Sequence, residues 1–250
     1  MAESSIEWTE HTWNPVTGCT KVSPGCKHCY AETMARRLKA MEAAGYERGF
    51  KLTLQPSRLE QPLLRRAPTV YFVNSMSDLF HPGVPGEYID RVLDVCTRTP
   101  QHTYQVLTKR ADRLPGFFAN RVVPPNVWLG VSVENKRHGV PRIDLLRQVN
   151  AQVRFLSVEP LLEDLGTLDL SGMHWVIVGG ESGHGARVMK AEWAEAVRVQ
   201  AIAQDVPFFF KQWGAWGPDG VRRDKKKNGR DLAGRRWDEF PVAVTASQAC

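Results

Sequence analysis

Three of the five cysteines of this chain lie close together near its N-terminus. Six residues separate Cys19 from Cys26, and two separate Cys26 from Cys29. The turn-forming residues around them are Gly18, Pro24 and Gly25. They predict a loop, because glycine tolerates positive φ and proline cannot continue a regular element. A loop can bring three thiolates to one centre, and soft sulfur ligands favour zinc, copper(I) or an iron–sulfur cluster.

The number of cysteines limits the choice of metal. A closed structural zinc site takes four protein ligands, and the remaining cysteines, Cys96 and Cys250, stand alone in the sequence. His11 is a better candidate for a fourth ligand than His28, which lies between two of the cysteines, so a zinc site with three cysteines and one histidine remains open. A four-iron cluster normally uses four thiolates. Three thiolates would leave one iron free to bind a small molecule.

The cysteine loop resembles the cluster loop of the radical S-adenosylmethionine (SAM) superfamily, with a variant spacing between the first two cysteines. Further motifs recur in one family: Asn74–Phe80, Leu107–Arg110, Gly130–Asn135, Phe155–Leu162, Gly179–Gly183 and Phe210–Gly214. The chain therefore resembles the phage-associated radical-SAM-like family of unassigned function. The likeness covers nearly its whole length.

The resemblance implies an activity and its cofactors. Cys19, Cys26 and Cys29 are expected to ligate a [4Fe-4S] cluster, whose free iron would bind SAM. A reductant protein such as flavodoxin or ferredoxin would supply the electron that cleaves SAM to methionine and a 5′-deoxyadenosyl radical, which abstracts hydrogen from a substrate carbon. The net charge of +6 is compatible with a phosphate-bearing partner, so a nucleic acid or nucleotide is the substrate class we consider.

Apolar strands alternate with helical stretches along the chain, which indicates parallel βα units. Strands are expected at Thr12–Val16, Thr69–Asn74, Tyr104–Thr108, Val127–Ser132, Val153–Ser157, Trp175–Gly179 and Pro207–Phe210. Helices are expected at Ala31–Ala44, Glu87–Arg98, Ala111–Phe118, Pro141–Val149 and Ala191–Gln204. This pattern predicts an α/β fold, a partial or nearly closed parallel (β/α) TIM-like barrel with six to seven strands. A doubly wound open sheet is the alternative.

The βα alternation stops after Trp213, and turn signals follow it. We expect a barrel domain at residues 1–216 and a small C-terminal hairpin extension with a tail at residues 217–250. The first residues are acidic and lack the apolar region of a signal peptide, and no apolar run approaches the ~20 residues that cross a bilayer. We therefore expect a cytoplasmic protein without a membrane partner.

Polar or glycine residues follow each predicted strand. In barrels of this class the carboxyl ends of the strands carry the chemistry. A buried charge is costly unless it is paired or used, so these residues are candidates for a functional site. The alternative is a ring of ion pairs that only closes the mouth of the barrel.

The resemblance implies roles for the first strand ends. The residues expected to hold the amino group of SAM are Asn74, Ser75 and Asp78. Tyr30, which follows the last cysteine, is expected to lie against the adenine. Lys109 is expected to pair with the carboxylate of SAM.

The later strand ends supply the remaining candidates. Ser132 and Glu134 are expected to accept hydrogen bonds from the ribose hydroxyls. The other cofactor candidates are Glu159, Gly179, Gly180 and Glu181, where the glycines would permit close approach of a ligand to the backbone, with a tight turn as the alternative. Lys211 and Trp213 are expected to match the charge of the substrate and to stack on it.

Other interpretations use the same residues differently. Lys109 and Lys211 could form salt bridges with the carboxylates of Glu159 and Glu181, or one of the two lysines could act as a Schiff-base nucleophile. Arg110 is expected to be solvated at the start of a helix. A zinc-stabilised nucleic-acid-binding module without SAM chemistry is the alternative function.

Overall fold

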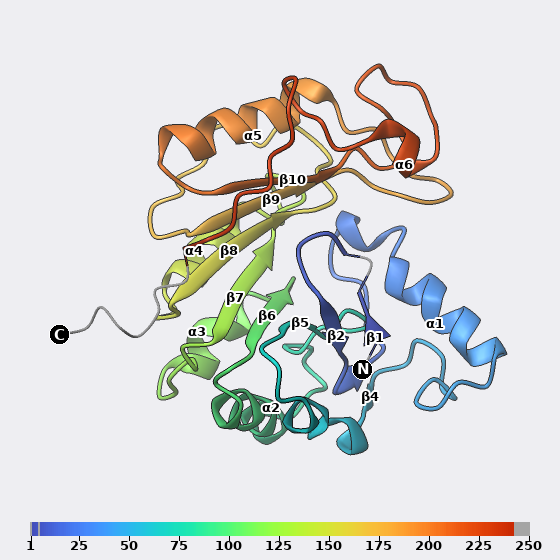
Figure 1. Ribbon diagram of the computed structural model, residues 1–250, viewed down its shortest axis with the longest axis vertical. Helices are drawn as coiled ribbons and strands as arrows, with labels where there is room; N and C mark the ends of the chain where they lie inside the picture. The colour runs from blue at the N-terminus through green and yellow to red at the C-terminus, as the bar shows by residue number, and fades with distance from the viewer. Residues whose placement is uncertain (1, 5, 243–250) are drawn as a thin grey trace.

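The computed structural model describes residues 2–4 and 6–242, so Cys250 lies outside the described residues. Within this range one sheet has the strand order β1-β2-β5-β6-β7-β8-β9-β10. Its strands are β1 (Ala2–Glu3), β2 (His11–Trp13), β5 (Val70–Val73), β6 (Thr103–Thr108), β7 (Val127–Ser132), β8 (Val153–Val158), β9 (Trp175–Gly179) and β10 (Phe208–Gln212). All neighbours from β2 to β10 pair in parallel, whereas β1 pairs with β2 antiparallel. The parallel strands fan out from β2 to β10 and form a partial TIM-like barrel (Figure 1).

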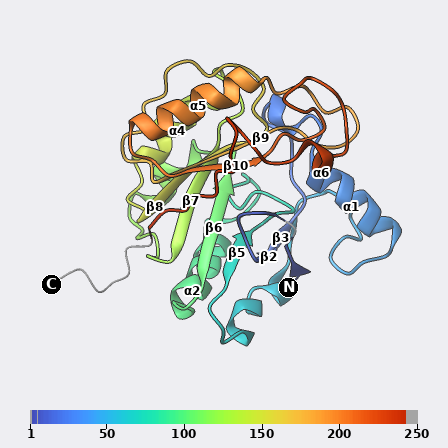
Figure 2. The ribbon, with the colours of Figure 1, turned by 45° about the horizontal axis from the view of Figure 1, so that its top comes forward.

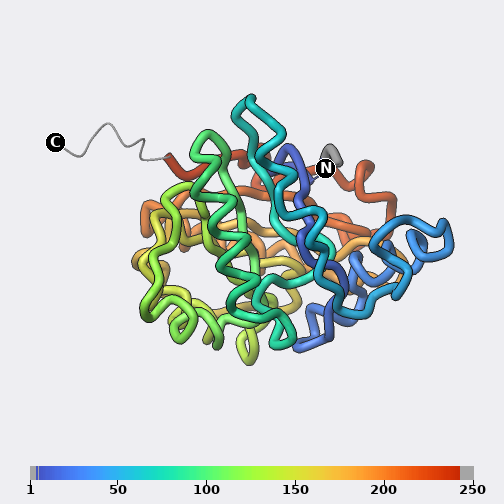
Figure 3. The backbone as a smooth tube through the Cα atoms, turned by 90° about the horizontal axis from the view of Figure 1, so that it is seen from below, coloured from blue at the N-terminus to red at the C-terminus, as the bar shows by residue number. Residues whose placement is uncertain are grey.

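Helices connect most of the parallel strands. The helices are α1 (Tyr30–Ala40), α2 (Gly86–Arg98), α3 (Arg113–Phe118), α4 (Pro141–Arg147), α5 (Ala191–Ala203) and α6 (Lys225–Asn228). Short 3₁₀ turns occur at Pro24–Cys26, Pro56–Arg58 and Gln61–Leu64, and β3 (Val16–Thr17) pairs with β4 (Thr53–Leu54) in a separate small sheet. Figures 1 and 3 both show α1 on the opposite side of the molecule from α3.

The strands alternate between two apolar faces, as a period of two requires. Residues of one face, such as Val106, Val131 and Val178, belong to the main core together with α2. The other face lines the inside of the half-barrel, where a second cluster contains Trp8, Phe155, Trp175, Ile177 and Phe209. Because both faces are covered, the strands are nearly continuous apolar runs in the sequence. These runs are the pattern from which the strands were predicted.

The observed elements confirm the expected fold class and shift several boundaries. The strand expected at Thr12–Val16 is instead two short strands, because Pro15 has no N–H to continue the ladder. The helix expected to reach Ala44 ends at Ala40. It does not continue, because Glu42 has a positive φ of 53°, which is outside the right-handed helical region. Cys96 is fully buried on α2, as a core residue is expected to be.

The segment after β10 folds back onto the edge of the sheet. Phe210 N–H donates to the carbonyl of Trp237, and Glu239 N–H donates to the carbonyl of Phe208. An antiparallel bridge between Trp216 and Arg222 encloses the turn that the sequence indicates at residues 217–220. Figures 1 and 2 show α6 on the same side of the molecule as α1. The division into a barrel and an extension at residue 216 stays a prediction.

Candidate functional site at the carboxyl edge of the half-barrel

The cysteine loop lies between β3 and α1 and is fixed at its first residue. Gly18 has a φ of +76°, and a Cβ on it would come within 2.2 Å of the Lys51 carbonyl oxygen, so only glycine fits. The Gly18 N–H donates to the carbonyl of Met76 over 3.0 Å, and Gly18 forms a parallel bridge with Ser77. The loop therefore starts directly beside the segment that follows β5.

All three cysteines of this loop lie in the described part of the chain. Cys19, Cys26 and Cys29 are free thiols and are partly buried. Cys29 is the N-cap residue of α1. Burial raises the pKa of the Cys19 thiol, although Arg110 acts in the opposite direction. Among the described residues, no group of three or more His, Cys, Asp and Glu side chains is arranged as a single-ion site, with or without His11.

The cysteine loop reaches the ends of several strands. Arg110, which follows β6, donates from Nη1 to Cys19 Sγ over 3.4 Å. A Cβ on Gly25 would lie 3.1 Å from Cγ of Glu134, which follows β7. A Cβ on Gly185, after β9, would lie 3.0 Å from the His28 ring. The loop thus lies over the carboxyl edge at which the strand-end candidates gather.

The Asp78 carboxylate hydrogen-bonds to several groups of the protein itself. Its carboxylate accepts from Thr108 Oγ1 at 2.7 Å and from the N–H groups of Phe80 and Lys109 at 3.0 Å each. Arg110 Nη1 donates to Asp78 Oδ2 at 3.0 Å, and the side chains of this ion pair are 5% and 8% exposed. Arg110 is therefore not solvated, contrary to the sequence-based expectation.

Asn74 and Ser75 follow β5 directly. Asn74 has a φ of +60°, its Oδ1 accepts from the Val16 N–H, and its Nδ2 is buried without a partner. Ser75 Oγ donates to Asn14 Oδ1 over 3.2 Å. Tyr30 is 65% exposed at the start of α1. Among Asn74, Ser75 and Tyr30, it is therefore Asn74 that has a buried donor without a hydrogen-bond acceptor.

Lys109, Ser132 and Glu134 form a second group at the ends of β6 and β7. Lys109 Nζ donates to Ser132 Oγ at 2.8 Å, and Arg142 Nη1 donates to Glu134 Oε2 at 2.6 Å. Burial acts to raise the pKa of Glu134, but Lys109 and Arg142 outweigh it and hold that pKa below its usual range. The other carboxylate oxygen of Glu134, Oε1, is buried and has no partner.

Lys211 and Glu159 meet at the ends of β10 and β8. Lys211 Nζ lies 2.8 Å from Glu159 Oε2 and 5.9 Å from the centroid of the Trp8 ring. This ion pair is one of the salt bridges that the sequence analysis gave as an alternative. An ammonium group engaged with a carboxylate is a poor amine nucleophile, so the geometry does not favour a Schiff-base role for Lys211.

The glycines at the end of β9 leave space that groups of the protein occupy. A Cβ on Gly179 would lie 2.9 Å from Glu159 Oε2, and one on Gly180 would lie 1.9 Å from the Trp213 carbonyl oxygen. Trp213 itself is 2% exposed, with its ring packed on Phe210. Its buried ring therefore has no free face for a substrate, which corrects the stacking role expected for it.

Glu181 pairs with a residue that the sequence did not single out. Arg187 donates to its carboxylate from the backbone N–H, Nε and Nη2, at 2.9, 2.9 and 2.6 Å. Burial acts to raise the pKa of Glu181, but these contacts with Arg187 lower it overall. Arg110, Arg142 and Arg187 were all missed as site residues, because their partners lie in other segments or across a turn.

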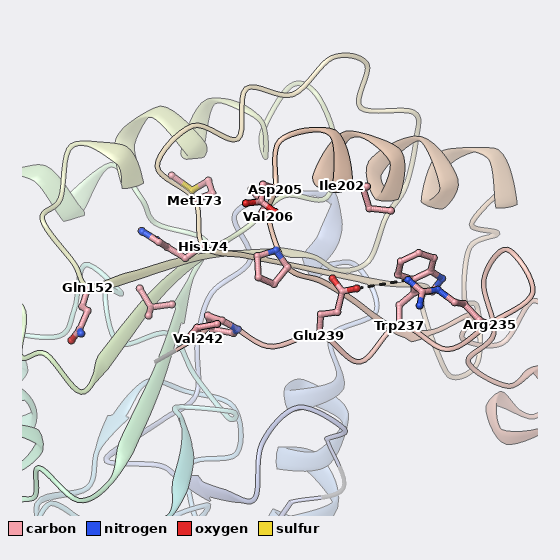
Figure 4. Close-up of a pocket in the computed structure, with 13 residues that line it drawn as sticks. Gln152, Met173, His174, Ile202, Asp205, Val206, Arg235, Trp237, Glu239 and Val242 are labelled. Atoms are coloured by element: carbon pink, nitrogen blue, oxygen red, sulfur yellow. Dashed lines mark ion pairs between the residues drawn. The ribbon is translucent and has the colours of Figure 1, made fainter. Parts of the chain in front are cut away.

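A cleft of about 630 Å³ lies away from this edge, at the amino ends of β8, β9 and β10 (Figure 4). His174, Asp205 and Trp237 are among the residues that line it. In TIM-like barrels this end is associated with stability rather than with chemistry. None of the predicted site residues lines it.

The fold and the site define a parallel half-barrel protein with a three-cysteine loop over the carboxyl edge of its sheet. Residues 3–241 match the family described as "Protein of unknown function (DUF5131)", and the chain belongs to that family. No curated protein sequence matches the chain significantly.

Among solved structures, the chain is similar to mutants of spore photoproduct lyase. One mutant has a TM-score of 0.46 at 15% identity, with 72% of this chain and 58% of that chain covered. Another, with bound AdoMet and dinucleoside spore photoproduct, has a TM-score of 0.45 at 14% identity, with 71% and 57% covered. The chain thus spans less than two thirds of the length of these structures. None of the helices in the described part of the chain has the length and apolarity of a membrane-crossing segment.

Proposed function

We propose that this protein is a radical SAM enzyme. The observation that carries the proposal is the cysteine loop: Cys19, Cys26 and Cys29 are free, partly buried and held by one segment over the carboxyl edge of the half-barrel. Three soft donors suit a [4Fe-4S] cluster with one iron left for another ligand. When bound, the reduced cluster and SAM together supply a 5′-deoxyadenosyl radical that abstracts hydrogen from a substrate carbon.

The polar groups beside the loop fit a ligand that both donates and accepts hydrogen bonds, as SAM does. Asn74 offers a buried amide donor without a partner, and Glu134 offers a buried carboxylate oxygen without one. Lys109 stands next to Glu134 with its ammonium on Ser132, where it can meet a carboxylate. In this proposal Asn74 and Glu134 bind the amino and ribose groups of SAM, and Lys109 binds its carboxylate.

The inner face of the half-barrel suits a reaction that must exclude water. Below the polar edge, aromatic rings fill the lumen, with Trp8 and Trp175 centroids 6.2 Å apart and Trp8 and Phe72 centroids 4.9 Å apart. Lys211 and Glu159 form an ion pair next to this cluster, with Lys211 Nζ 5.9 Å from the centroid of the Trp8 ring. They are the groups we assign to the substrate, since they are the charged groups next to an apolar surface that excludes water.

The remaining parts of the proposal concern partners and setting. The exposed lysines of α6 and the net charge of +6 support a phosphate-bearing substrate such as a nucleic acid or nucleotide. Reduction of the cluster requires an electron donor of the flavodoxin or ferredoxin kind. A phage-associated origin and a cytoplasmic setting belong to the same proposal.

The test is anaerobic reconstitution of the wild-type protein with iron and sulfide. We expect about four irons per chain, a brown chromophore, and 5′-deoxyadenosine on addition of SAM and dithionite. Cys26→Ala should lose the chromophore and its EPR signal. Cys96→Ala is the matched control, because that thiol is fully buried on α2 and should leave the cluster intact. A colourless wild type with one bound zinc, or a full cluster in Cys26→Ala, would refute the assignment.

A further inference from the structure

Arg110 is the one arginine among the described residues whose guanidinium contacts a thiol of the cysteine loop. Nη1 donates to Cys19 Sγ at 3.4 Å and to Asp78 Oδ2 at 3.0 Å. Nη2 donates to the carbonyl and the hydroxyl of Thr20 at 2.8 and 3.0 Å. The side chain is 5% exposed, so these contacts are made away from water.

The position of this guanidinium is fixed from the other side as well. Asp78, which anchors it, accepts from Thr108 Oγ1 and from the N–H groups of Phe80 and Lys109. Thr20 is held in addition by His81, whose Nε2 lies 2.9 Å from the Thr20 hydroxyl. Arg110 therefore connects the end of β6 rigidly to the first cysteine of the loop.

We propose that Arg110 is a positioning residue for the iron–sulfur cluster. It donates a hydrogen bond to the sulfur of Cys19 and thereby raises the reduction potential of the cluster. The inference rests on the proposed function, because it requires Cys19 to be a cluster ligand. A cationic donor on a ligand sulfur stabilises the more negative, reduced state, and hydrogen bonds to sulfur are among the factors that set the potentials of such clusters. The guanidinium is planar and forked, which lets it hold a carboxylate and a sulfur at the same time.

The experiment is an EPR-monitored redox titration of the reconstituted protein and its variants. Arg110→Gln removes the charge and the forked donor, and its midpoint potential should be more negative than that of the wild type. Arg113→Gln is the matched control. Arg113 donates to the carbonyls of Phe80, His81 and Val84 in the same region but contacts none of the cysteines, so its potential should equal that of the wild type.

A third variant keeps the test decisive if Arg110→Gln does not fold. Arg110→Lys retains the charge but cannot contact Asp78, Thr20 and Cys19 together, and its potential should also fall, by less than in Arg110→Gln. The inference would be overturned if the Arg110 variants had the same midpoint potential as the wild type, or if Arg113→Gln lowered the potential by the same amount. Either result would leave the proposed function standing. A wild type that takes up no iron would overturn both.

Discussion

At the scale of single residues, the carboxyl edge of the half-barrel is organised by three carboxylate–arginine pairs. Asp78, Glu134 and Glu181 are all at most 8% exposed as whole residues, and each is bonded to an arginine. A buried carboxylate without such a partner would be strongly destabilised, so the pairs allow charge to be kept at this edge. The Glu134 pair is the most deeply buried of the three, and it still leaves one carboxylate oxygen without a hydrogen-bond partner.

The pair of Glu134 and Arg142 gives a prediction about stability. Arg142→Met removes the donor to Glu134 Oε2 and to the Ser132 carbonyl, and leaves the buried carboxylate with Lys109 as its remaining nearby cation. We expect the free energy of unfolding in urea to fall by about 3–5 kcal/mol at neutral pH. The double variant Glu134→Gln with Arg142→Met should recover part of that loss.

An exposed ion pair of the same chain serves as the control. Arg98 and Asp94 are 50% and 61% exposed and four residues apart on α2. Arg98→Gln should change the free energy of unfolding by less than about 1 kcal/mol. Equal losses in Arg142→Met and Arg98→Gln would show that the buried pair contributes no more than a surface pair.

At the scale of elements, the sequence predicted the strands much better than the contacts between them. Val127–Ser132 and Trp175–Gly179 were placed to the residue, because buried parallel strands leave apolar runs that end abruptly. The polar strand ends were also located correctly, since the topology brings all carboxyl ends to one edge. The partners were not: Arg110 and Arg142 read as ordinary helix residues, and their burial depends on the distant segments that cover them. Likewise, nothing local in the sequence indicates that Trp213 turns into the core.

Gly130 on β7 gives a prediction for the inner face of the sheet. A Cβ there would lie 2.4 Å from Cζ of Phe155, a ring that is itself confined by Trp8 and Trp175. Gly130→Ala should therefore lower the free energy of unfolding by about 1–3 kcal/mol through overpacking. In a double-mutant cycle, Phe155→Leu should relieve part of this cost.

A second glycine offers a control of opposite sign. Gly116 lies within α3, a Cβ on it would meet nothing within 4 Å, and it has no positive φ. Gly116→Ala should stabilise the protein by about 0.5–1 kcal/mol, because alanine favours the helix. If Gly130→Ala proves as stable as the wild type, the inner face is more adaptable than its packing indicates.

At the scale of the whole molecule, the segment after β10 covers an edge that would otherwise be open. An unpaired edge strand is prone to pair with other chains, and here residues 237–239 bond to β10. The same segment contributes Leu232 and Trp237 to the main core. On the other side of the sheet, β1 occupies the edge beside β2. The half-barrel is thus protected at both edges by the two ends of the described chain, and its carboxyl edge is left to the cysteine loop.

This arrangement predicts that the C-terminal segment unfolds together with the barrel in one transition. Trp237 packs edge-to-face on Phe208 of β10, with ring centroids 5.9 Å apart, and its Nε1 donates to the Leu232 carbonyl at 2.8 Å. Trp237→Ala should lower the stability of the entire chain by about 3–5 kcal/mol, since it opens a cavity in the shared core. Phe240→Ala is the control, because Phe240 is 45% exposed and should cost far less. If calorimetry resolves two unfolding transitions, and Trp237→Ala changes the midpoint temperature of only one of them, the segment is instead an independent unit.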